Sequence, residues 1–337
     1  MYKKLLPLVL MISVVLAACG NEETMNEEGE AASSNKTEEN AAEQSNENHS
    51  DTDEAVEGEE ITVSYLGEDY TVVVPTDKIV AASQEAMEDA AILGIKPIGA
   101  VAHAGEFPDY LGDSMSEAAE IGDKMQPNNE TLLQLEPDVI LGTSKFQPEV
   151  VDNLKSVAPM IPISHIATNW KENLLVTAEV AGKTEEAENI IEEYETDVAE
   201  LSESLAGALE DQQVIMVRIR SGDIFVYGEE VYFNPVLYGD LGLTVPDEVA
   251  AAESQEMITL EKLAEMNPDH MYVQFEETEN ADAPEALNEL ESNDIWNSIE
   301  AVKNDNVYVN AIDPLAAGGT AWSKTEFLNV VTDTLTD

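Results

Sequence analysis

Two stretches decide the fold of this chain: Glu-Thr-Leu-Leu-Gln-Leu-Glu-Pro-Asp-Val-Ile-Leu-Gly at residues 130–142, and Glu-Lys-Leu-Ala-Glu-Met-Asn-Pro-Asp-His-Met-Tyr-Val at residues 261–273. In both, a glutamate opens a short amphipathic helical segment, Pro-Asp follows seven residues later, and a strand of the buried type comes next. Pro-Asp alone is a common helix stop, so it is the matched spacing that favours equivalence. We expect one such helix-turn-strand unit in each of two lobes.

Short apolar runs alternate with helical patterns around both units. This alternation is typical of βα units and predicts an α/β fold with mainly parallel sheets. We expect strands or hairpins at residues 61–65 with 70–74, 78–83, 97–101, 139–142, 214–220 with 223–227, 271–275 and 307–310, and a helix at 85–93.

One long helix is predicted between the two series of elements. The pattern from Lys183 to Leu209 contains no proline, and no glycine before Gly207. At about 1.5 Å per residue it would reach nearly 40 Å, which is more than a small lobe needs. We therefore expect Rossmann-like lobes at 61–182 and 210–337, joined by a helix at 183–209.

The N-terminus has the pattern of a lipoprotein signal peptide. Two lysines precede an apolar run, and Leu-Ala-Ala-Cys at residues 16–19 matches the bacterial lipobox. The run is shorter than the roughly 18 residues that a membrane-spanning helix needs. We expect residues 1–18 to be removed and Cys19 to carry a lipid on the outer face of the cytoplasmic membrane, in a Gram-positive bacterium. Because Cys19 is the only cysteine, disulfides, zinc–cysteine clusters and a cysteine nucleophile are excluded from the folded part.

The chain is strongly acidic along its whole length, with a net charge of −55. Residues 19–60 contain almost no large apolar side chains, which predicts a disordered acidic linker behind the lipid. Residues 61–337 still contain 55 Asp and Glu against 12 Lys and Arg. Nucleic acid is therefore excluded as a partner. The acidity also suggests a halophile-like protein from a salt-tolerant or alkaline-living bacterium, because salt screens such self-repulsion.

Motifs spread from residue 61 to residue 337 resemble the iron-siderophore substrate-binding lipoproteins of bacterial ABC importers, the ferric hydroxamate/siderophore-binding family. No single motif is specific, and the resemblance depends on their order. Besides the lipobox, they are Leu93-Gly-Ile-Lys-Pro-Ile-Gly99, Pro127-Asn-Asn-Glu130 through Pro137-Asp138, Val217-Arg-Ile-Arg-Ser-Gly-Asp-Ile-Phe-Val-Tyr227, Asp240-Leu-Gly-Leu243, Asn267-Pro-Asp269 and Asp313-Pro-Leu-Ala-Ala-Gly-Gly-Thr-Ala-Trp322.

The resemblance implies a class III substrate-binding protein, in which two α/β lobes are joined by one rigid helix. A cleft between the lobes would hold one ferric siderophore and hand it unchanged to an ABC transporter permease dimer. The chain would then be a monomeric receptor and not an enzyme, with no cofactor of its own, because iron arrives inside the ligand.

The most informative candidates for ligand binding are Arg218 and Arg220, the only arginines in a chain with 70 acidic residues. The period of a strand places both on the same face. Their guanidinium groups could bind ligand oxygens through paired charge-assisted hydrogen bonds, or pair with neighbouring acids. The resemblance favours the ligand, because similar positions in the family face the cleft.

Other candidates lie where open α/β sheets bind ligands or where an aromatic wall could form. Lys145 follows a predicted strand, and Lys124 could also oppose the arginines, although exposed lysines are usually only solvated. Trp322 follows two glycines, with Thr320 as a plausible N-cap for the last helix, and could stack on the ligand or close the core. Further candidates are Tyr227 and His103, then Tyr232 and Phe233, whereas Trp170 and Trp296 are expected to pack in the core.

Glu130 and Glu261 have a different expected role. In the family, one exposed glutamate on each lobe docks into arginine pockets of the permease, and these two residues occupy equivalent helix starts. A glutamate in a first helical turn is also favoured by the helix dipole, without any partner.

The sequence gives less support to other functions than to a siderophore receptor. The scattered histidines lack metal-ligand spacing, and the sequence contains no G-x-S-x-G, Walker or G-x-G-x-x-G motif. Cobalamin or haem on the same scaffold stays possible, haem with His103 as the axial ligand to check. A surface adhesion or signalling lipoprotein is the alternative without transport. For the siderophore itself we expect an anionic hydroxamate or mixed citrate-hydroxamate type.

Overall fold

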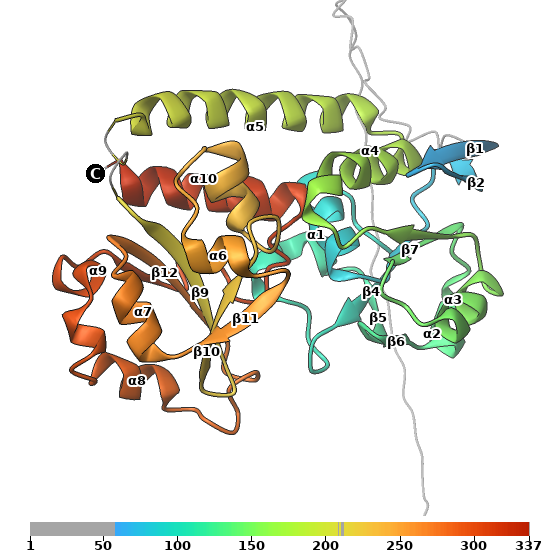
Figure 1. Ribbon diagram of the computed structural model, residues 1–337. Helices are drawn as coiled ribbons and strands as arrows, with labels where there is room; N and C mark the ends of the chain where they lie inside the picture. Colours follow the sequence, from blue (N-terminus) through green and yellow to red (C-terminus); the bar gives the residue numbers. More distant parts are fainter. Residues whose placement is uncertain (1–57, 208, 210–211, 337) are drawn as a thin grey trace, which may run out of the picture. The chain divides into compact units, whose positions relative to one another are not determined.

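The computed structural model describes residues 58–207, 209 and 212–336 (Figure 1). The predicted signal peptide, the lipid site at Cys19 and most of the acidic linker lie outside these residues. Within the described residues, no helix has the length and apolar character required to cross a membrane. We call residues 58–182 the N-terminal lobe and residues 212–336 the C-terminal lobe.

The N-terminal lobe is built on a six-stranded sheet in the order β6-β5-β4-β3-β7-β8. All neighbouring strands are parallel except β5 and β6, so the expected parallel sheet is confirmed here. The strands are β3 (Ile79–Ala81), β4 (Gly99–Ala102), β5 (Ala119–Asp123), β6 (Gln126–Pro127), β7 (Val139–Thr143) and β8 (Met160–Ile163). The helices are α1 (Gln84–Ile92), α2 (Asn129–Leu135), α3 (Pro148–Lys155) and α4 (Trp170–Ala181), and the hairpin of β1 (Glu59–Tyr65) and β2 (Glu68–Val74) packs against α4.

The C-terminal lobe is built on a five-stranded mixed sheet in the order β11-β10-β9-β12-β13. Strands β9, β12 and β13 run parallel, whereas β10 pairs antiparallel with both β9 and β11. The antiparallel edge is a direct consequence of the predicted hairpin between β9 and β10. The elements are β9 (Val214–Arg220), β10 (Asp223–Tyr227), β11 (Gln255–Ile258), β12 (His270–Phe275), β13 (Val307–Val309), α6 (Asp247–Ala251), α7 (Leu260–Met266), α8 (Ala286–Glu291), α9 (Glu300–Lys303) and α10 (Ala321–Leu335).

The repeated unit forms equivalent structures in the two lobes. Helix α2 ends at Glu136, with φ 49° and ψ 56°, and helix α7 ends at Asn267, with φ 48° and ψ 57°. Each left-handed residue is followed by Pro-Asp and then by a buried strand, β7 or β12. The left-handed conformation stops the helix and turns the chain into the sheet. The predicted helix-turn-strand equivalence is therefore confirmed.

The long helix is α5 (Thr184–Leu205), and its 22 residues correspond to about 33 Å. It ends four residues before the expected boundary at Leu209, because Ala206 leaves the helical conformation with a ψ of 119° and Gly207 has a φ of 82°. Its buried side chains recur at intervals of seven and four residues, which gives the helix one apolar face. Helix α10 packs against α5, and it also contacts α1 and α4 of the N-terminal lobe (Figure 1).

A buried lysine fixes α10 to its neighbours. Lys324 is 2% exposed, and its Nζ lies 2.6 Å from Oδ2 of Asp240. The hydroxyl of Tyr194 on α5 donates to the same oxygen at 2.6 Å, and the rings of Trp170 and Tyr194 lie 5.7 and 5.4 Å from the ammonium. Burial lowers the pKa of Lys324, against the raising effect of Asp240. The ion pair thus joins α10 to Asp240, and Trp170 on α4 and Tyr194 on α5 pack around it.

We predict that Lys324→Ala destabilises the protein. Breaking a buried ion pair costs about 3–5 kcal/mol, and the partial exposure of Asp240 reduces this to about 2–3 kcal/mol of unfolding free energy. Urea denaturation followed by circular dichroism measures the change. The control Lys303→Ala removes a half-exposed lysine and should cost less than about 0.5 kcal/mol. Equal stability of the two variants would contradict the structural role of Lys324.

Candidate functional site

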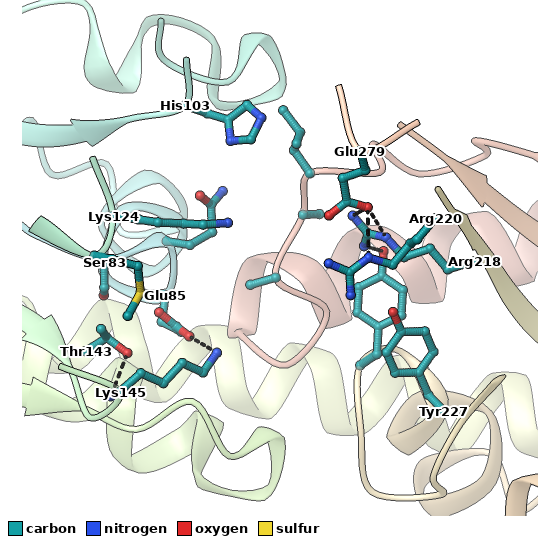
Figure 2. Close-up of a pocket in the computed structure, with 16 residues that line it drawn as sticks. Ser83, Glu85, His103, Lys124, Thr143, Lys145, Arg218, Arg220, Tyr227 and Glu279 are labelled. Carbon is teal, nitrogen blue, oxygen red and sulfur yellow. Dashed lines mark hydrogen bonds and ion pairs between the residues drawn. The ribbon is translucent and has the colours of Figure 1, made fainter. Parts of the chain in front are cut away.

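A cavity of about 320 Å³ opens between the lobes, within the usual range of about 300–1,000 Å³ for small-molecule sites (Figure 2). It lies at the carboxyl ends of the strands in both sheets, where α/β folds bind ligands. Two glutamates offset four cations, so the cavity keeps a net positive charge in a chain of net charge −55. The lining residues are Ser83, Gln84, Glu85, His103, Lys124, Met125, Thr143, Lys145, Arg218, Arg220, Tyr227, Tyr232, Glu279, Leu315, Ala316 and Ala317.

The N-terminal lobe contributes two lysines, each in the loop after a parallel strand. Lys145 follows β7 and lies 3.6 Å from Oε1 of Glu85, which is in the first turn of α1. Its side chain is 51% exposed against 12% for Glu85, so the ammonium stays open to the cavity. Lys124 follows β5, and no carboxylate among the described residues forms an ion pair with it. Both lysines can therefore neutralise a bound anion.

The C-terminal lobe contributes Arg218, which is almost fully engaged by protein groups. Its Nε and Nη2 each lie 2.9 Å from Oε2 of Glu279, and its Nη1 donates to the hydroxyl of Tyr232 at 2.8 Å. Its side chain is only 10% exposed. Burial by itself would lower the pKa of Arg218, but Tyr232 and Glu279 beside it give a net increase. The sequence suggests either a ligand contact or an ion pair with a neighbouring acid. Arg218 lines the cavity and also forms such an ion pair.

Arg220 is the more accessible arginine, with 39% of its side chain exposed. Its Nη1 donates to Oε1 of Gln255 at 3.0 Å, and its Nε lies 3.5 Å from Glu279. Beside it, burial raises the pKa of Tyr227, although both arginines act in the opposite direction. The tyrosine hydroxyl therefore stays protonated at neutral pH and can donate a hydrogen bond into the cavity.

His103 connects the two lobes at the edge of the cavity. It lies at the base of a tight turn, where its backbone pairs with that of Glu106, and its Nε2 is 3.1 Å from the hydroxyl of Thr278. Thr278 donates in turn to Glu276 at 2.5 Å. Burial opposes ionisation of Glu276, but hydrogen bonds from Thr278 and from the backbone of Glu279 lower its pKa. His103 therefore serves as a contact across the cleft in this structure.

Not every predicted aromatic residue reaches the cavity. Trp322 is not among the lining residues, and its ring packs on Tyr110 at 4.6 Å instead. Tyr232 lines the cavity, whereas Phe233 is fully buried against Phe327. The structure therefore places Trp322 and Phe233 in packing roles, as it does Trp170 and Trp296, which are 6% and 3% exposed.

A buried carboxylate positions residues 315–317, which form part of the cavity wall. Glu88 on α1 is fully buried and accepts hydrogen bonds from the hydroxyls of Tyr110, Thr320 and Ser323 at 2.5–2.6 Å, and from the backbone N–H of Ala317 at 2.8 Å. Burial raises the pKa of Glu88, although its four donors act in the opposite direction. Since Thr320 is the N-cap of α10, as expected, Glu88 ties the N-terminal lobe to the segment that leads into that helix.

We predict that Glu88→Gln lowers the free energy of unfolding by about 1–3 kcal/mol. The amide group of glutamine cannot accept from all four donors, so buried polar groups lose their partner. Thermal or urea denaturation measures the loss. The exposed Glu120→Gln, which makes the same chemical change, should stay within about 0.5 kcal/mol of the parent. A Glu88→Gln variant as stable as its parent would contradict this account of the network.

The two glutamates expected to dock on a permease occupy matching positions. Glu130 is the second residue of α2 and Glu261 the second residue of α7, and both are exposed. The helices begin with side-chain caps from Asn128 and Thr259, which accept from backbone N–H groups of the first turn. The carboxylates of Glu130 and Glu261 are therefore not the N-caps of these helices.

Sequence reasoning missed Glu279 and Glu85, the two anions of the cavity. Glu279 follows strand β12, and Lys145 follows the equivalent strand β7 of the repeat, so the repeat itself marks this loop as part of the site. Within the described ranges, no group of three or more His, Cys, Asp or Glu residues is placed to hold a metal ion. His165 pairs with Ser144, and His270 with Gln212 and Tyr308.

Comparison with known proteins identifies the family. A family model described as periplasmic binding protein matches residues 79–311. The chain belongs to this family of periplasmic binding proteins. Among curated relatives, the iron-uptake system-binding protein of Bacillus subtilis (strain 168) is 44% identical over 332 residues, which cover 98% of this chain and 97% of the relative. The probable siderophore-binding lipoprotein YfiY of the same organism is 26% identical, over 92% of this chain and 91% of that one.

Solved structures of periplasmic binding proteins give the same picture of the fold. The triscatecholate siderophore binding protein FeuA from Bacillus subtilis, complexed with ferri-bacillibactin, is 49% identical, with a TM-score of 0.76 over 82% of this chain and 98% of that chain. Staphylococcus aureus SirA, complexed with staphyloferrin B, is 22% identical, with a TM-score of 0.68 over 82% of this chain and 98% of that chain. The second similarity supports the two-lobed fold alone.

Proposed function

We propose that this periplasmic binding protein is a receptor that binds one ferric siderophore of the catecholate type in its cleft and delivers it to an ABC permease. The observation that carries the proposal is the cavity's group of four cations, which two separate sheets bring together in a chain of net charge −55. The receptor performs no chemical step, and the iron arrives as part of the ligand.

The charge of the ligand distinguishes the siderophore types. Each fully deprotonated catecholate carries two negative charges, so a ferric ion bound by three of them leaves a trianionic complex. Three hydroxamates carry one charge each and leave a neutral complex, which gains little from a cluster of cations. The cavity therefore favours a catecholate over a neutral tris-hydroxamate, and we propose a catecholate in place of the hydroxamate or citrate-hydroxamate type expected from the sequence. The relative described as a triscatecholate siderophore binding protein supports the same choice.

The proposal includes the placement of the receptor. Cleavage before Cys19 and acylation would hold the protein on the extracytoplasmic side of the membrane, as a monomer near its permease. The predicted acidic linker would keep the local concentration of receptor high there. A relative described as a siderophore-binding lipoprotein supports the lipid anchor.

Fluorescence quenching of the three tryptophans tests the proposal directly. We expect a ferric tris-catecholate to bind with submicromolar affinity, and a neutral ferric tris-hydroxamate at least about a hundredfold more weakly. Ferric citrate, haem and cobalamin complete the panel. Quenching by haem or cobalamin alone, or preference for the hydroxamate, would refute the catecholate receptor.

We predict that removing one accessible cation weakens binding of the tris-catecholate by about tenfold to a hundredfold. The variants are Lys124→Ala, Lys145→Ala and Arg220→Ala, because charge-assisted bonds to an anion are each worth about 1.5–3 kcal/mol. Lys155→Ala, an exposed lysine on α3 outside the cavity, is the control and should keep the parent affinity. Unchanged affinity in all three cavity variants would remove the cations from the site.

We also predict that Glu130→Ala combined with Glu261→Ala abolishes delivery without affecting binding. Glu130 lies on α2 and Glu261 lies on α7, and neither residue lines the cavity. Uptake of iron-loaded ligand into cells that carry the matching permease measures delivery, and quenching measures binding. The double variant Glu120→Ala with Glu289→Ala, two other exposed acids on separate lobes, serves as the control. Normal uptake by the first double variant would show that delivery does not depend on these two glutamates and would contradict their docking role.

A further inference from the structure

One carboxylate oxygen occupies the donors that a ligand would need on the C-terminal side of the cavity. Oε2 of Glu279 lies 2.9 Å from both Nε and Nη2 of Arg218 and 3.5 Å from Nε of Arg220. Figure 2 shows the Glu279 carboxylate joined by dashed lines to the arginine side chains. A ligand oxygen that binds the same nitrogen atoms must therefore displace Glu279 or share them with it.

The loop that carries Glu279 is held firmly, so the contact is a built feature of the site. The backbone N–H of Glu279 donates to Oε2 of Glu276 at 2.7 Å, and its carbonyl accepts from the N–H of Ser221 at 3.1 Å. Next to it, Asn280 is fully buried, donates to the carbonyl of Ile219, and accepts from the N–H of Gly222. The loop is thus bound to the hairpin that presents both arginines.

We propose that Glu279 is a specificity-determining residue, an internal anion that competes with the ligand for Arg218 and Arg220. The inference deepens the proposed catecholate receptor and rests on it. The cavity attracts a trianionic ferric complex strongly enough for its oxygens to displace the Glu279 carboxylate from the exposed donors of the arginine pair. A neutral ferric complex does not displace it, because replacing an ion pair by contacts with uncharged oxygens leaves the arginine charges less well compensated.

The competing carboxylate also lowers the positive charge that the ligand meets. The side chain of Glu279 is 24% exposed, and it lines the cavity together with the four cations. Its negative charge repels an anionic ligand over a few ångströms, where screening by salt is weak. The residue therefore reduces affinity for every anion that needs the arginines, and it reduces it most for anions that bind too weakly to displace the carboxylate.

The Glu279→Gln variant tests the proposal by fluorescence-quenching titration of the full receptor. Removing the carboxylate frees the arginine donors, so affinity for the ferric tris-catecholate should rise about tenfold. Affinity for a ferric citrate complex should rise by a larger factor, which narrows the preference for the tris-catecholate over ferric citrate relative to the parent protein. A neutral ferric tris-hydroxamate should change by less than about twofold, because it gains no charge attraction.

Two further variants separate charge from position. Glu277→Gln makes the same change at an exposed neighbour outside the cavity, and it should leave all affinities within about twofold. Glu279→Asp keeps the charge but retracts the oxygen from the arginines, so affinity for the tris-catecholate should rise by about threefold. Thermal melts of each variant report whether the fold is kept.

The outcomes distinguish this inference from the proposed function. If the parent protein binds no ferric siderophore, the proposed function and the inference both fall. If the parent binds the tris-catecholate and Glu279→Gln binds it equally or more weakly, only the inference falls, because Glu279 then merely holds the arginines in place. An unchanged affinity of Glu279→Asp would overturn it as well, even if Glu279→Gln failed to fold.

Discussion

Scarcity of positive charge is the constraint on which the structure of this protein depends. The chain has 15 lysines and arginines against 70 acids, so its net charge is strongly negative. Four of these cations line one cavity, and both arginines are among them. Because the Debye length is about 10 Å at 0.1 M salt, a bound anion responds mainly to this local group. A receptor with a strongly negative surface can therefore still bind a negative ligand.

Two buried ionisable groups, Lys324 and Glu88, connect elements of the two lobes. Lys324 joins α10 to Asp240 and to the aromatic rings of α4 and α5, and Glu88 collects four donors between α1 and the segment that leads into α10. One of the four donors to Glu88 is the backbone N–H of Ala317, a residue of the cavity wall. The same α10 thus connects the stability of the protein with the shape of its site.

Much of the fold could be predicted because it follows from local patterns. The bounds of β9 and β10, the repeated unit and the cap at Thr320 all depend on neighbouring residues, and the sequence displays them. Glu279 could not be identified as the partner of the arginines, because no local pattern distinguishes it from the other acidic residues among the 70 in the chain. The choice between the two roles expected for Trp322 could not be made for a similar reason, since its packing partner Tyr110 is distant in the sequence. Contacts between lobes depend on tertiary packing, and no periodicity reveals them.

The dependence of ligand affinity on salt tests the central claim most directly. The protein is titrated with a ferric tris-catecholate at sodium chloride concentrations from about 20 mM to 500 mM. The change of affinity with salt shows whether the ligand responds to the attraction of the local cations or to the repulsion of the whole chain. If the four cations of the cavity dominate, affinity falls steadily as salt rises. If the net charge of −55 dominates, screening relieves a repulsion and affinity increases with salt, which would contradict the account.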